Sequence, residues 1–227
     1  MHLQKAIDYG VFARSLSIGA ETMVMRFQPD QPMHSRYAVE HGFLPPQAGT
    51  EVTIGRLVNA FFRWEFNSCE TLVTGGEVYP IDYANACPDV ALTSLHYYFP
   101  WAMKALVKWC LFALVTGRRP RLDLETDRFF TVADEPGLSY REKLDVYRDL
   151  TDAYFDSARY YDFWADKQAR LDEIVLDWVA SPGFDQLLVR TVRSVYPAQE
   201  HDQFIAHLRG LLDLWVRDET ARLRTNV

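Results

Sequence analysis

The sequence predicts an α+β fold, in which an antiparallel sheet with packed helices is followed by an all-helical C-terminal region. Strand-like segments with glycine turns fill the first half, and apolar stripes at helical spacing fill the second. Composition changes in the stretch GRRPRLDLETDRFF between them. We therefore expect a first domain over 1–117, a linker over 118–138 and a helical extension over 139–227.

The first half is predicted to contain two β-hairpins and one short helix. Alternating apolar and polar residues, interrupted by glycine, indicate the strands. Apolar residues at intervals of three and four indicate the helix. The expected elements are a hairpin of 11–19 and 21–27, a helix over 53–62, and a hairpin of 68–74 and 77–83 around Gly75 and Gly76.

Helix boundaries in the second half are marked by proline, glycine and a capping motif. A helix over about 100–116 has Pro100 in its first turn and Gly117 after its end. Ser139 and Glu142 form the pattern of a capping box. The apolar stripe over 141–179 fits one helix of about 58 Å, or two helices that meet near Tyr160. Two further helices are expected at about 184–195 and 200–223.

Composition narrows the classes of function. The chain has 227 residues and a net charge of −7, which argues against a nucleic-acid-binding protein. Its three cysteines lack metal-ligand spacing and favour a reducing, cytoplasmic compartment, and no signal peptide is expected. The long apolar run contains Lys104 and Lys108, so we expect a buried helix rather than a membrane span.

The second hairpin contains a pair of acids whose placement depends on the turn. A three-residue turn, Gly75–Glu77, would put Glu70 directly opposite Asp82, whereas a two-residue turn would put the acids on opposite faces. Opposed carboxylates repel unless a cation lies between them, and Mg²⁺ prefers such oxygen ligands. Asn85 would add a third oxygen if the strand turns after Asp82. Solvated acids around a two-residue turn are the alternative.

The stretch SCETLVTGGEVYPIDYAN resembles the carboxy-terminal lobe of ATP-grasp enzymes, in which two acids on neighbouring strands and a following asparagine hold Mg²⁺. Glu70, Asp82 and Asn85 stand in the matching positions. HLQKAIDYGVFARSLSIG resembles the segment that leaves the adenine-binding hinge. The resemblance implies that Gln4, Arg14 and Arg26 contact ATP, with the two arginines also acting in catalysis.

The resemblance implies an ATP- and Mg²⁺-dependent ligase, which activates a carboxylate as an acyl phosphate for attack by an amine or thiol. Its partners would be ATP and a carboxylate substrate, without nucleic acid or membrane. Because the matched region starts at the hinge, we expect a carboxy-terminal half, a homo-oligomer or an upstream lobe supplied elsewhere. A non-catalytic lobe with a helical interaction module is the alternative. For Arg14 itself, the alternative to a phosphate contact is a salt bridge with a nearby acid such as Asp8 or Glu21.

Overall fold

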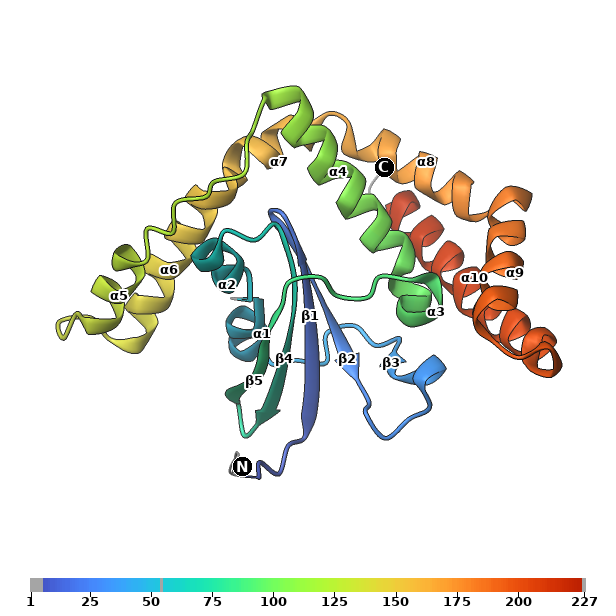
Figure 1. The fold of residues 1–227 in the computed structure, drawn as a ribbon, viewed down its shortest axis with the longest axis horizontal. Helices are drawn as coiled ribbons and strands as arrows, with labels where there is room; N and C mark the ends of the chain where they lie inside the picture. Colours follow the sequence, from blue (N-terminus) through green and yellow to red (C-terminus); the bar gives the residue numbers. More distant parts are fainter. Residues whose placement is uncertain (1–5, 54, 226–227) are drawn as a thin grey trace.

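The computed structural model describes residues 6–53 and 55–225 of the chain. Within these ranges the N-terminal half forms a five-stranded antiparallel sheet in the order β3-β2-β1-β4-β5 (Figure 1). This confirms the α+β class and both predicted hairpins. The strands are β1 (Val11–Ile18), β2 (Glu21–Phe27), β3 (Tyr37–Ala38), β4 (Phe66–Thr74) and β5 (Glu77–Asn85).

Helices cover both faces of the sheet and make up the C-terminal half. The first helices and single turns are η1 (Met33–Ser35), α1 (Pro46–Thr53), α2 (Gly55–Phe62), α3 (Leu92–Leu95), η2 (His96–Tyr98) and α4 (Phe99–Thr116). The later ones are α5 (Asp127–Asp134), α6 (Tyr140–Phe155), α7 (Ser157–Ala165), α8 (Gln168–Val179), α9 (Pro182–Val195), η3 (Ala198–Glu200) and α10 (His201–Thr225).

The strand register separates two faces of the sheet. On one face, Leu16 and Ile18 join the main core with residues of α4. On the other face, Ala13 packs with Ala48 of α1, and Gly55 of α2 lies against the side chains of Ser15 and Cys69. Arg14 shares the α4 face, because side chains two residues apart in a strand point to the same side.

The turn between β1 and β2 brings the sheet against α4. Gly19 has a φ of 54°, and a Cβ at this position would lie 2.0 Å from Cδ2 of Trp109. A side chain here would therefore displace the indole. In Figure 1 this hairpin end lies beneath α4, whereas the N-terminus lies at the opposite end of the sheet.

The helix α4 is the core helix that the sequence predicts. Pro100 lies in its first turn and Gly117 ends it in the left-handed conformation, as expected. Among the described residues, one helical stretch, Leu92–Thr116, is long and apolar enough to cross a membrane. Its two lysines instead pair with acids of the same fold: Lys108 with Glu21, and Lys104 with Asp172. Paired charges of this kind are expected in a helix that packs inside a protein rather than in one surrounded by lipid.

The predicted stripe over 141–179 forms three helices rather than one or two. Ser139 and Glu142 complete the predicted capping box of α6. Asp156 then adopts a φ of 53° and separates α6 from α7, and a second break at Asp166 and Lys167 precedes α8. The breaks let the chain bend around α4, as Figure 1 shows.

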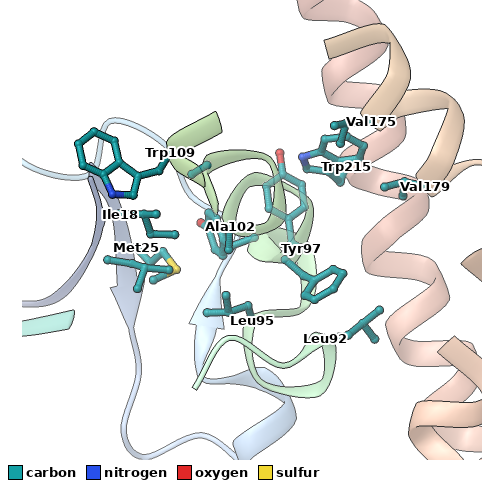
Figure 2. Packing of buried hydrophobic residues seen from close by; sticks show 14 of the residues in the cluster. Ile18, Met25, Leu92, Leu95, Tyr97, Ala102, Trp109, Val175, Val179 and Trp215 are labelled. Carbon is teal, nitrogen blue, oxygen red and sulfur yellow. The ribbon is translucent and has the colours of Figure 1, made fainter. Parts of the chain in front are cut away.

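Sheet and C-terminal helices share one hydrophobic core. The main cluster of buried residues extends from Leu16 and Met25 on the sheet to Val175 on α8 and Trp215 on α10. Figure 2 shows this packing, with Trp109, Ile18 and Met25 on one side and Trp215, Val175 and Val179 on the other. The segment expected as a linker contains α5, whose Phe129 belongs to the same cluster.

Candidate functional site

The hairpin of β4 and β5 closes through two residues, not three. Thr74 pairs with Glu77, and Gly75 and Gly76 have φ values of 59° and 86°. Positive φ at both central residues is characteristic of a tight type I′ turn, which glycine accommodates without steric cost. The three-residue turn is therefore wrong, and without a further irregularity the two acids would lie on opposite faces.

The strand β5 corrects the register by itself. Thr71 pairs with Pro80, but Glu70 pairs with Asp82, so β5 contains one extra residue between these pairs. Such a bulge shifts all following side chains of one strand to the other face. Glu70 and Asp82 are thus register partners, as predicted, although the cause is a bulge rather than the turn.

A second irregularity brings Asn85 to the same face. The next pair is Ser68 with Asn85, so β5 again uses three residues where β4 uses two. The predicted change of direction after Asp82 therefore takes the form of a bulge. The Nδ2 atom of Asn85 donates to Oγ of Ser68 at 3.3 Å. Its amide oxygen accepts no hydrogen bond from the described part of the chain and is free for another ligand.

Arg14 joins these residues from β1. It is the register partner of Glu70, and its Nη1 lies 3.7 Å from Oε1 of Glu70. Its Nη2 donates to Oγ of Ser68 at 3.3 Å. We call Arg14, Ser68, Glu70, Asp82 and Asn85 the Arg14 cluster. Of the two acids expected as structural partners of Arg14, Glu21 pairs with Lys108 instead.

The electrostatics of the cluster are set by burial and by the two facing acids. Burial raises the pKa of Glu70, and Asp82 raises it further, while Arg14 lowers it in part. The side chains of Arg14 and Glu70 are 20% and 25% exposed, so both are accessible to a ligand. The cluster contains one positively and two negatively charged side chains. A cation next to the two acids would offset the repulsion between them.

Aromatic residues form one side of the cluster. The guanidinium of Arg14 lies 5.7 Å from the ring centroid of Phe27, which in turn packs against Tyr37. Burial raises the pKa of Tyr37, and the adjacent Arg14 opposes this increase. Ser68 could have been found from its strand parity with Glu70. Tyr37 lies in a two-residue strand that offers no sequence pattern.

The remaining predicted residues lie elsewhere. Arg26 is the register partner of Ala13, so its side chain points to the opposite face from Arg14, and it pairs with Glu40. The structure does not bring the two arginines together. Gln4 lies outside the described residues. Of the six predicted site residues, Arg14, Glu70, Asp82 and Asn85 meet in one cluster.

Glu70, Asp82 and Asn85 are the residues of the cluster that could hold a metal ion, because each has a side-chain oxygen. Within the described residues, no group of three or more His, Cys, Asp or Glu side chains is arranged to hold a metal. Two carboxylates and an amide oxygen instead match Mg²⁺, which keeps several water or phosphate ligands. Comparisons with models of protein families, with curated proteins and with solved structures gave no match.

Proposed function

We propose that this chain provides the Mg²⁺- and phosphate-binding lobe of an ATP-grasp-type ligase. The observation that carries the proposal is the Arg14 cluster, in which Asp82 and Asn85 reach the face of Glu70 through two successive bulges. Opposed acids at an edge hairpin destabilise it unless a cation lies between them. Bulges next to functional sites re-aim side chains in this way.

Each residue has a distinct role in the proposal. Glu70 and Asp82 supply charged oxygens to Mg²⁺, and Asn85 supplies a neutral one. Arg14 exchanges its contact with Ser68 for a phosphate group, and its planar guanidinium donates two parallel hydrogen bonds to two oxygens of that group. Bound Mg²⁺ would offset the charge that develops when phosphate moves from ATP to a substrate carboxylate. The acyl phosphate would then react with an amine or thiol and release phosphate.

Binding of Mn²⁺, a substitute for Mg²⁺ that is visible by electron paramagnetic resonance, tests the metal site. We expect the full chain to bind one Mn²⁺, and Glu70→Gln and Asp82→Asn each to weaken binding by about tenfold or more. The control is Glu77→Gln, which removes an exposed acid from the same hairpin. Equal binding by all four proteins, or no binding at millimolar Mn²⁺, would refute the site.

Nucleotide binding then separates the two functions considered. Calorimetry with MgATP is expected to show binding that Arg14→Gln weakens, while Mn²⁺ binding of that variant persists. Metal binding without any nucleotide binding would instead favour a non-catalytic lobe. In that case the C-terminal helices would be the functional part of the chain.

A further inference from the structure

A second cavity lies away from the Arg14 cluster, between the sheet and the C-terminal helices. It has a volume of about 640 Å³, which is within the range of small-molecule sites. Residues of β2, η2, α4, α8 and α10 contribute to it, together with His41 from the loop after β3. Its walls consist mainly of aromatic and charged side chains, among them Tyr97, Tyr98, Trp101, Trp215 and Asp218.

Four aromatic side chains dominate the walls. Tyr97, Tyr98 and Trp215 are buried, and Trp101 is half-buried. Figure 2 shows Tyr97 and Trp215, which both line the cavity, between the start of α4 and α10. The indole N–H groups of Trp101 and Trp215 have no hydrogen-bond acceptor among the described residues. The cavity therefore combines aromatic surface with unused polar groups.

Three charged side chains of the cavity wall, Lys104, Glu219 and Arg222, form a neutral network with one further acid. This acid is Asp172, which is buried and does not line the cavity. Lys104 Nζ lies 2.7 Å from Asp172 and 3.6 Å from Glu219. Arg222 lies 2.7 Å from each of the same two acids. Two positive and two negative charges therefore cancel, and this network offers no net charge to a ligand.

Asp218 is the remaining charge. Its Oδ2 accepts a hydrogen bond from the hydroxyl of Tyr97 at 2.7 Å. Because that hydroxyl proton is used, the oxygen of Tyr97 accepts from Nε2 of His41 at 3.3 Å. No Lys or Arg of the described ranges forms an ion pair with Asp218, which is solvent-exposed. The cavity thus has one uncompensated carboxylate at its aromatic wall.

We propose that this cavity binds a small organic cation, an ammonium group on an apolar body. Aromatic faces attract cations, most strongly at tryptophan, and a nearby carboxylate adds direct attraction. An anion would meet the charge of Asp218, and a neutral apolar molecule would gain nothing from it. The proposal depends neither on the metal site nor on nucleotide binding.

Choline and its neutral carbon isostere, 3,3-dimethylbutan-1-ol, provide a matched pair of ligands. The full chain is titrated at pH 8, where histidine side chains are ordinarily neutral. Ring currents should shift the choline methyl resonances in proton NMR. We expect choline to bind at least tenfold more tightly than the isostere. Equal affinity for the two ligands, or no binding of choline at about 10 mM, would refute the proposal.

Variants locate the binding to this cavity. Asp218→Asn keeps an acceptor for Tyr97 but removes the charge, so choline binding should weaken about tenfold or more. Asp213→Asn is the control, because Asp213 is also exposed on α10 but does not line the cavity. Glu70→Gln should bind choline like the unmodified chain. Unchanged choline binding by Asp218→Asn would contradict the assignment.

Discussion

Arg14 and Glu70 are direct partners across β1 and β4, with 3.7 Å between Nη1 and Oε1. On its other side, Glu70 is the partner of Asp82 on β5. The carboxylate of Glu70 is therefore attracted by Arg14 on one neighbouring strand and repelled by Asp82 on the other.

Glu70→Gln should stabilise the chain at pH 7 when no divalent cation is present. Its pKa is raised by burial and by Asp82, so the ionised form costs stability above the ordinary pKa of 4.5. We expect the free energy of unfolding in urea to increase by about 0.5 kcal/mol at pH 7 and to stay unchanged at pH 3. A loss of stability would show that the Arg14 pair outweighs the repulsion.

Asp172→Asn should destabilise the chain by about 3 kcal/mol. Asp172 is 2% exposed, and although burial opposes ionisation, Lys104 and Arg222 hold its pKa below 3.8. A lowered pKa gives stability that is present above pH 3.8 and is lost as the pH falls further. The free energy of unfolding of Asp172→Asn in urea should therefore depend less on pH below 3.8 than that of the unmodified chain. Asp177→Asn, on the same helix but exposed, is the control.

His96 should make the fold sensitive to mild acid. It is 1% exposed, and burial lowers its pKa from 6.5 to about 4. Unfolded chains take up this proton near pH 6.5, so stability is complete above that value and falls between pH 6.5 and about 4, by about 3 kcal/mol. The test variant is His96→Asn, because His96 has a φ of 51° and asparagine adopts a positive φ more readily than most residues. Its free energy of unfolding in urea should depend less on pH over this range than that of the unmodified chain.

Gly19→Ala should destabilise the chain by about 2–4 kcal/mol, because it adds backbone strain and a clash with Trp109. Gly42→Ala is the matched control. Gly42 also has a positive φ, 67°, but nothing lies within 4 Å of its Cβ position, so only the strain of about 1 kcal/mol applies. Thermal unfolding of both variants measures the difference. Equal losses would contradict the close contact.

The three cysteines should react with thiol reagents at two different rates. Cys87 and Cys110 are exposed, whereas Cys69 is buried and its burial raises the pKa of the thiol to about 12. At pH 8 we expect two fast and one slow labelling events in the native chain, because the thiolate is the reactive form. All three should react rapidly in denaturant. Fast native labelling of Cys69 would contradict its placement under α2.

Local signals in the sequence predicted most of the fold. Gly117 and the capping box at Ser139 define helix ends through contacts within a few residues, so their consequences are readable without tertiary structure. The break at Asp156 has no glycine or proline to mark it. On its two sides the chain packs against different partners, since α6 lies against α2 whereas α7 lies against α4, and these contacts involve distant parts of the chain.

The candidate site was only partly predictable, for a similar reason. Strand parity alone puts Arg14 on the same face as Leu16 and Ile18, and the two acids were recognised from their positions on either side of the glycine turn. The bulges of β5 were not predictable, because they depend on how two strands pair rather than on either strand alone. The cavity at Asp218 was missed altogether, since β2, α4, α8 and α10 reach it from distant segments.

The shape of β5 has a consequence for how copies of this chain meet. This strand forms one outer margin of the sheet, and Pro80 provides no N–H to a neighbouring molecule. The two bulges interrupt the hydrogen bonding of this edge strand and increase its twist, whereas a strand from another molecule pairs most readily with a flat edge. The same irregularities that aim Asp82 and Asn85 thus protect the sheet from intermolecular strand addition and aggregation.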